Sequence, residues 1–241
     1  MSSEPKPPIW ARPEPRGRGR HAPLSRAQIA RTALKIADEE GLEAVSIRRI
    51  ARELRAGAMS LYHYFDSRDE LLELMGDTVA GEMLVPELPP DWRAALKAIA
   101  AAGRATFRRH PWLLATLQER PAISPNMLRH VEQSSQAVRA LEEEGHDRAL
   151  LTTLVLAVDD YMLGYTLREL AAGGDPDDRG RQLAKRVTHD AGDPNVRYLL
   201  ESGEFPMLAT FLDSGTPFPV GDRFEQGLDW LLDGFAAQLR R

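Results

Sequence analysis

Cysteine is absent from the 241 residues of this chain. Without thiols the chain forms no disulfide, no thiolate metal site and no cysteine nucleophile, and this composition fits a reducing cytoplasm. No apolar run approaches the ~18 residues that a membrane span needs. The basic N-terminus is not followed by the apolar segment of a secretory signal. We therefore expect a cytoplasmic chain with no membrane partner.

Signatures of catalysis and of cofactor binding are missing as well. The sequence has no glycine-rich phosphate loop and no nucleophile elbow. The adjacent carboxylates Asp159 and Asp160 are the best acid–base candidates, but neighbours on a helix point about 100° apart. The six histidines show no metal-ligand spacing on one helix face; they stand at positions 21, 63, 110, 130, 146 and 189. We expect no enzyme, no catalytic residue, no cofactor and no metal.

The alternating pattern of strands is missing too, and we find no internal repeat. The hydrophobic fraction is 43%, which suffices for a real core. Because the apolar residues recur at helical spacing, we expect an all-α fold, with a three-helix head followed by a larger helical domain.

Charge divides the chain unevenly. Residues 1–66 carry 12 lysines and arginines against 8 acidic residues, whereas residues 67–241 carry 19 against 28. A basic head on an acidic body suggests a polyanionic partner for the head alone, although a chance fluctuation explains so modest an excess equally well. Prolines and glycines make residues 1–23 a flexible basic arm that follows DNA or stays a solvated tail.

Helix starts in the head are marked by serines. Ser25, Ser46 and Ser67 each stand as an N-cap before an apolar periodic stretch. They predict a helix that ends at Gly41, a second from Ser46 to Leu54, and a helix from Ser67 to about residue 84. Between the last two, a third helix is expected over residues 58–65. The head with its connecting helix then spans residues 24–84, before prolines at 86, 89 and 90.

Helices account for most of the body, residues 91–241. The pattern predicts them over 91–110, 124–145, 147–172 and 222–239, with a short one near residue 112. Residues 175–221 read as irregular and polar, with short helical pieces at most.

Two short helices joined by a tight turn, at about 46–65, form a DNA-reading device when the second helix can enter the major groove. Leu61 and Phe65 would hold the third helix against the first two, leaving an aromatic surface outside. An ordinary three-helix core is the competing interpretation. Two exposed tyrosines and a histidine within six residues favour the reading device.

The head resembles that of the tetracycline-repressor (TetR) family of transcriptional regulators. The resemblance is carried by SIRRIAREL at 46–54, AMSLYHYF at 58–65 and SRDELL at 67–72. In the body, HPWL at 110–113, RP at 120–121 and FEQGLDWLLDG at 224–234 are similar to the C-terminal domain of the subgroup closest to the tetracycline repressor itself.

The resemblance implies where DNA is met. Arg48 matches a base-reading arginine, whose fork suits guanine O6 and N7. The groove-facing positions correspond to Ala58, Met59, Ser60 and His63, and the phosphate-facing ones to Ser46, Tyr62, Tyr64 and Arg68. The chain departs from the family at the turn, where Arg55 replaces the usual glycine, and at Gly57, where a capping serine or threonine is common.

The resemblance also implies a homodimer and a pocket for a small effector. Dimerisation through the helices at 147–172 and 222–239 would use Leu154, Val158, Phe224, Leu228, Leu231 and Phe235. Candidate pocket residues, each of which suits a plain core role equally well, are Leu84, Ile99, Phe107, Trp112, Leu117, Tyr161 and Tyr165. Because three of these are apolar where the tetracycline repressor is polar, we expect a largely apolar effector and no magnesium.

We thus expect a ligand-responsive regulator, by family default a repressor released from a palindromic double-stranded DNA operator. The alternative is a DNA-binding architectural protein without a ligand, which a body of this size argues against. The sequence does not identify the operator, the regulated genes or the effector.

Overall fold

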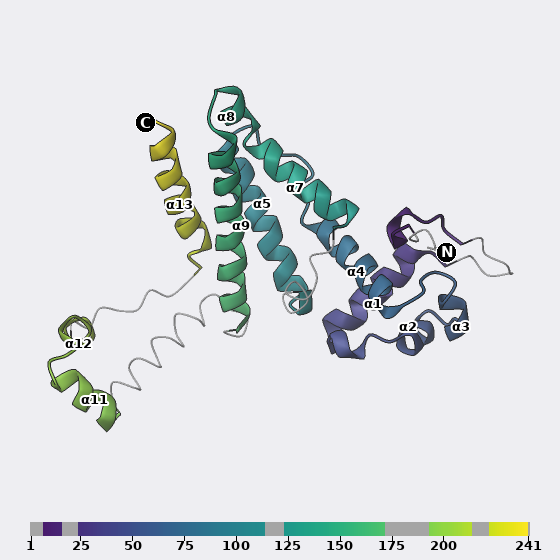
Figure 1. Cartoon of the computed structure of the whole chain (residues 1–241). Helices are drawn as coiled ribbons and strands as arrows, with labels where there is room; N and C mark the ends of the chain where they lie inside the picture. The colour runs from purple at the N-terminus through teal and green to yellow at the C-terminus, as the bar shows by residue number, and fades with distance from the viewer. Residues whose placement is uncertain (1–6, 16–23, 114–122, 172–192, 214–221, 241) are drawn as a thin grey trace, which may run out of the picture. The chain divides into compact units, whose positions relative to one another are not determined.

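The structure is a computed structural model that describes residues 7–15, 24–113, 123–171, 193–213 and 222–240. Within these ranges the chain is helical and contains no strand, as the all-α expectation requires (Figure 1). Two compact units are present, Met1–Leu163 with Phe235–Arg241, and Gly164–Gly234.

The head consists of α1 (Arg26–Glu40), α2 (Ile47–Glu53) and α3 (Ala58–Leu61). The predicted caps are confirmed, since Ser25 Oγ accepts from the backbone N–H of Gln28 and Ser46 Oγ from that of Arg49. Gly41, with φ of +88°, ends α1. The side chains that fill the centre of this bundle are fully buried, and the largest are Ile29, Ile36, Ile50, Leu61 and Phe65.

The third helix is shorter than predicted. It ends at Leu61, and Tyr62, His63 and Tyr64 form a turn instead of continuing to Phe65. Tyr64 is only 7% exposed and packs in the head core beside Phe65. The expectation that Tyr64 lies on the surface is therefore wrong.

Part of the N-terminal arm is docked. The 3₁₀-helix η1 (Ile9–Ala11) inserts Ile9 into the head core. Arg12 donates to Glu70 over 2.6 Å, and Arg26 donates to the carbonyl of Arg12 over 2.8 Å. The prediction of a flexible arm is wrong for residues 7–15, because an apolar anchor and a paired arginine fix them. Residues 16–20, with the alternating arginines, lie outside the described residues.

Helix α4 (Arg68–Glu82) leads from the head into α5 (Trp92–Arg109), α7 (Pro125–Ala137) and α8 (Arg139–Glu143). Ser67, Asp91 and Ser124 cap α4, α5 and α7. The expected single helix at 124–145 is divided at Val138. Helices α4, α5 and α7 pack on one another, so the prolines at 86–90 mark a loop within the first unit.

Helix α9 (Arg148–Ala171) has 24 residues and a window of mean hydropathy 1.3, enough by length and composition to cross a membrane. The expectation from the sequence that no apolar run approaches the length of a membrane span therefore needs correction. This part of α9 belongs to the first unit, and four of its apolar side chains are buried there: Leu151, Leu154, Val158 and Met162. This one-sided burial, with Asp159 and Asp160 in the same helix, is typical of a core helix.

The second unit contains α11 (Pro194–Glu201), α12 (Pro206–Asp213) and most of α13 (Phe224–Leu239). The short helices α11 and α12 fall in the segment expected to be irregular. Tyr165 of α9 stacks edge-on against Phe224 at 5.3 Å, and the Tyr165 hydroxyl contacts Asp222 Oδ1 at 3.3 Å.

Candidate nucleic-acid interface and ligand pocket

The predicted groove-facing residues lie mainly on the outer side of α2 and α3. Arg48, Tyr62 and His63 are exposed, and Met59 is 77% exposed. Ala58 and Ser60 are half-buried near the start of α3, and Ser60 Oγ donates to the Gly57 carbonyl. The other predicted contacts, Ser46 and Arg68, are also exposed. Only Tyr64 is withdrawn into the core, and we assign it to packing.

Two neighbouring arginines on α2, Arg48 and Arg49, differ in whether carboxylates of the protein bind them. Arg49 donates to Glu40 over 2.7 Å and to Glu53 over 2.8 Å. The hydrogen bonds that it donates to these two carboxylates raise the pKa of the Arg49 guanidinium above its ordinary value. Among the described residues, no hydrogen bond or ion pair engages the exposed Arg48. Arg48 can therefore reach a base edge, whereas Arg49 is held by the protein.

The turn before α3 carries the backbone strain that its sequence suggests. Arg55 has φ of +52°, the left-handed region that favours glycine. It is the one non-glycine residue with positive φ in the described part of the chain. The departure from the family pattern at Arg55 thus leaves the tight turn intact, but in a conformation unfavourable for arginine.

Head and body meet at His110, which follows α5. The buried His110 imidazole places Nδ1 2.7 Å from Asp38 Oδ1 of α1, and Nε2 3.2 Å from Glu82 Oε2 of α4. Trp112 Nε1 donates to the same Asp38 oxygen over 2.8 Å. These bonds connect the end of α5 to both α1 and α4.

Helix α7 is hydrogen-bonded to α4 and to the loop after it. Asn126 Nδ2 donates to the Asp77 carbonyl, and its backbone N–H donates to Asp77 Oδ1, both over 2.8 Å. Gln133 accepts from Val85 N–H and donates to Val85 O. These bonds connect α7 to α4, the helix that leads to the head.

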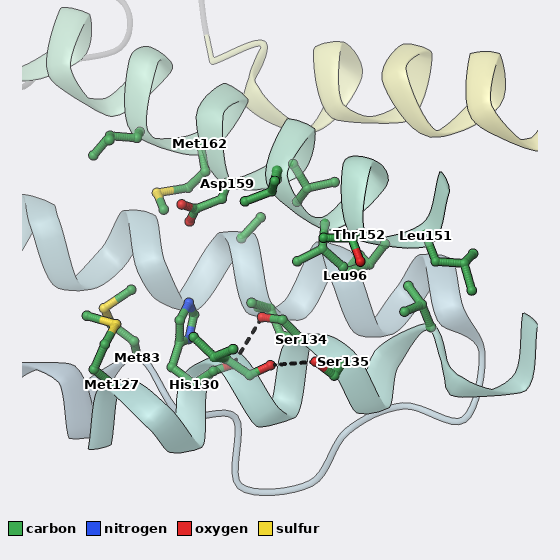
Figure 2. A pocket seen from close by; sticks show the side chains of 18 of the residues that line it. Met83, Leu96, Met127, His130, Ser134, Ser135, Leu151, Thr152, Asp159 and Met162 are labelled. Atoms are coloured by element: carbon green, nitrogen blue, oxygen red, sulfur yellow. Dashed lines mark hydrogen bonds between the residues drawn. The ribbon is translucent and has the colours of Figure 1, made fainter. Parts of the chain in front are cut away.

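A pocket of about 660 Å³ lies among α5, α7 and residues 148–163 of α9 (Figure 2). Its walls are mostly apolar. His130 and Asp159 point into it from opposite sides, from α7 and α9 (Figure 2). The size and the few convergent polar groups are those of a site for a drug-sized molecule. Apolar side chains that line it include Met83, Leu96, Ile99, Phe107, Met127 and Met162.

The pocket changes the acidity of its two facing groups. Burial lowers the pKa of His130 below its ordinary value, against the opposing effect of Asp159. Loss of hydration raises the pKa of Asp159, and this effect exceeds the lowering by His130. His130 is 8% exposed, and its buried Nδ1 has no hydrogen-bond partner among the described residues. An orphaned buried nitrogen of this kind calls for a partner such as a ligand or a water.

The structure brings only some of the predicted pocket residues to this pocket. Ile99 and Phe107 line it. The neighbour of Leu84, Met83, lines it instead of Leu84, while Trp112 packs against the head core. Tyr161 and Tyr165 are also not among the lining residues, and Leu117 lies outside the described residues. Sequence reasoning missed the pocket role of His130 and of Asp159, whose only sequence signal was a carboxylate within an apolar helix.

Most of the predicted dimer residues serve their own subunit. Leu154, Val158, Phe224 and Leu228 are almost fully buried within the single chain, while Leu231 and Phe235 are half-buried. Phe235 packs edge-on against Trp92 at 6.0 Å. Periodicity identified the apolar stripes of α9 and α13 but not what covers them. The exposed apolar residues of these helices are Leu156, Leu167 and Trp230.

No group of three histidines or carboxylates that could hold a metal occurs within the described ranges. The features that decide the family are a capped helix–turn–helix, an α4 connector and a pocketed helical body. Residues 29–75 match the model of bacterial regulatory proteins of the tetR family, and residues 85–239 match the tetracyclin repressor-like C-terminal domain. The chain belongs to the TetR family of transcriptional regulators.

Curated relatives extend the similarity over nearly the whole chain. The HTH-type transcriptional repressor DrrR1 of Streptomyces coeruleorubidus is 35% identical over 228 residues, 94% of this chain and 82% of that protein. An HTH-type transcriptional regulator of Saccharopolyspora erythraea is 31% identical over 95% of this chain and 91% of that protein. HTH-type transcriptional regulators are thus similar to this chain over nearly its whole length.

Among solved structures, ActR of Streptomyces coelicolor has the same arrangement. Its complex with actinorhodin matches with a TM-score of 0.69 at 28% identity, covering 91% of this chain and all of that one. The similarity to TetR-family proteins therefore extends from the sequence to the fold.

Proposed function

We propose that this TetR-family regulator is a homodimeric repressor. It binds a palindromic DNA operator through α2 and α3 and leaves it when a small molecule fills the pocket. The observation that carries this function is the bonded connection from the pocket wall α7 to the connector α4. The repressor DrrR1 and the ligand complex of ActR support the two halves of the proposal. Such a protein works in the cytoplasm beside its operator and catalyses no reaction.

DNA contact rests on the exposed set Arg48, Met59, Tyr62 and His63. Arg48 supplies base reading, because its guanidinium is free and a guanine edge accepts two parallel hydrogen bonds. Tyr62, Ser46 and Arg68 lie where phosphate contacts would fix the orientation of the head. One short α3 reads few base pairs, so specificity requires two heads on two half-sites.

Dimer contact is supported by a large apolar residue on the outer side of α13. Trp230 lies two residues from both Leu228 and Leu232, which are buried, so it occupies the opposite side of α13. Large side chains exposed this way are typical of a subunit interface.

The effector releases the operator through the contacts that connect the pocket to the head. A molecule that occupies the pocket displaces α7, and the Asn126–Asp77 and Gln133–Val85 bonds carry the displacement to α4. The His110 contacts then carry it to α1. Such a ligand favours the DNA-incompetent arrangement by as much as it binds that arrangement more tightly.

The deciding experiment selects a preferred sequence from a random DNA pool with the full-length protein. We expect a palindrome. On this sequence, Arg48→Ala should weaken binding by about 1–3 kcal/mol and relax one base position in each half-site. Arg49→Ala is the matched control, because it removes the same charge from an arginine that Glu40 and Glu53 already engage.

Equal losses in the two variants would show that charge, not base reading by Arg48, accounts for the affinity. A protein that binds DNA of any sequence equally well would favour the architectural alternative instead. Selected sequences without two-fold symmetry would contradict the dimeric mode of binding.

A further inference from the structure

The Asp159 carboxylate makes no polar contact with the described residues that would stabilise the fold. It lies on the pocket side of α9, and among the described residues it makes no hydrogen bond or ion pair. Much of the pocket wall is apolar and includes Met83, Ile99 and Met162. His130 faces it from α7 without forming a hydrogen bond to it (Figure 2).

The nearby hydroxyl groups cannot satisfy this carboxylate. Ser134 donates its proton to the His130 carbonyl over 3.0 Å, and Ser135 donates to the Val131 carbonyl over 3.1 Å. Thr152 donates to the Arg148 carbonyl over 2.9 Å. Since a hydroxyl has one proton, these groups can only accept toward the pocket. These three hydroxyl groups therefore add acceptors, and no donors, to the inner surface.

The ion pair at another part of the pocket wall does not change this balance. Arg148 donates to Glu142 through both Nε and Nη2, so its charge is already engaged. Asp159 and its neighbour Asp160 are both exposed, but only Asp159 is among the lining residues. Asp159 is thus the one carboxylate of the pocket wall, within the described residues, that no cation accompanies.

We propose that the effector is an apolar molecule bearing a protonated amine, which binds between Asp159 and His130. This inference rests on the proposed function, because it names the class of ligand that the regulator detects. An apolar ligand strips the Asp159 carboxylate of water, and the free energy lost is regained only if the ligand supplies a positive donor. The amine donates to the carboxylate, and its remaining N–H groups find acceptors at His130 and Ser134.

The test uses three probes that share one fluorescent tetracycle and differ in one substituent: 1-pyrenemethylamine, 1-methylpyrene and 1-pyrenecarboxylate. Binding to the full-length protein is followed by fluorescence anisotropy at pH 7. We expect the amine to bind about tenfold or more tightly than the hydrocarbon, as a charge-assisted hydrogen bond implies, and the carboxylate to bind more weakly than either.

Variants assign the preference to one residue. Asp159→Asn should bring the amine to within about twofold of 1-methylpyrene. Binding of the hydrocarbon should be no weaker than to the parent, because the ligand no longer strips a charge of water. Asp160→Asn removes the same charge one position along α9 and should retain the full preference. His130→Phe keeps a ring of similar shape and should weaken the amine alone.

Three results would overturn the inference. These are an amine that binds no more tightly than 1-methylpyrene, an equal effect of Asp159→Asn and Asp160→Asn, or no binding of any probe. The proposed function is judged separately, by operator binding without probes. A neutral or anionic molecule that fills the pocket and releases the operator would refute the amine and leave the repressor intact. Loss of sequence-specific DNA binding would refute the repressor, while the charge preference of the pocket could still be measured.

Discussion

His110 Nδ1 lies 2.7 Å from Asp38 Oδ1, and this contact joins the end of α5 to the first helix of the head. The imidazole is buried, and its other nitrogen faces Glu82 at the end of α4. One side chain therefore connects the pocket-lining helix α5 with two helices of the DNA-binding part. Its removal should affect both stability and the response of DNA binding to the effector.

We expect His110→Ala to lower the free energy of unfolding by about 1–3 kcal/mol, because it empties a buried site and removes partners from two carboxylates. Urea denaturation measures this loss. Trp112→Phe removes the Nε1 donor to Asp38 together with part of a ring that packs on the head core, and should lose at least about 1 kcal/mol. If the His110 variant is as stable as the parent, the contact does not hold the head to the body.

The Arg12–Glu70 pair predicts a pH dependence. Burial alone would raise the pKa of Glu70, but hydrogen bonds from Arg12 and from the Asp66 N–H outweigh it, and the pKa lies below its ordinary value. A lowered carboxyl pKa stabilises the fold above the unfolded-state value, about 4.3. This contribution is lost as pH falls through the lower folded-state pKa.

Glu70→Gln should therefore be less stable than the parent at pH 7, and the difference should shrink below about pH 4. Urea denaturation at pH 7 and at the lowest pH where the fold persists provides the comparison. Glu87→Gln changes an exposed loop carboxylate and serves as the control. A difference that stays constant over this range would mean that Glu70 does not anchor the arm through its charge.

Alanine substitutions at two glycines of α4 distinguish the effect of packing on stability from that of helix propensity. A Cβ on Gly81 would lie 2.9 Å from Asn126 Nδ2, whereas a Cβ on Gly76 would meet nothing within 4 Å. Gly76→Ala should stabilise the protein by up to about 1 kcal/mol, the propensity gain in a helix. Gly81→Ala should forgo that gain, because it displaces Asn126 from Asp77.

The same pair tests the transmission from the pocket. Gly81→Ala should reduce the loss of operator affinity that an effector causes, whereas Gly76→Ala should leave the response unchanged. DNA binding titrated with and without the effector measures the response. An unchanged response in Gly81→Ala would exclude the Asn126–Asp77 contact from the coupling.

Local features of the fold could be predicted from the sequence, and long-range ones could not. The serine caps depend on residues three positions apart, so Ser25 and Ser46 identified two helix starts correctly. Whether Tyr64 faces solvent depends on packing with distant residues, and there the prediction was wrong. The apolar stripe of α13 was visible, but burial of Phe224 within its own chain was not. His130 and Asp159 lie far apart in the sequence and face each other only in the folded chain.

Arg55 offers a stabilising substitution. Its φ of +52° costs a side-chain-bearing residue about 1–2 kcal/mol relative to the right-handed region. Arg55→Gly should remove this strain and, after the greater freedom of glycine in the unfolded chain, stabilise the head by about 0.5–1 kcal/mol. Arg55→Ala loses the same charge but keeps the strain, so it should not stabilise. Thermal unfolding of both variants distinguishes backbone strain from charge.

Trp230 is 67% exposed on α13, on the side opposite Leu228 and Leu232, which are buried. In a symmetric dimer the same side chain enters the interface from each subunit, so Trp230→Glu would place two buried charges there. Loss of such an anchor typically costs about 2 kcal/mol or more of association free energy. Sedimentation equilibrium at micromolar concentration should then detect monomers with unchanged helix content. Trp10→Glu, at an exposed tryptophan of η1, should remain dimeric. Should the Trp230 variant stay dimeric too, the subunits meet through another surface.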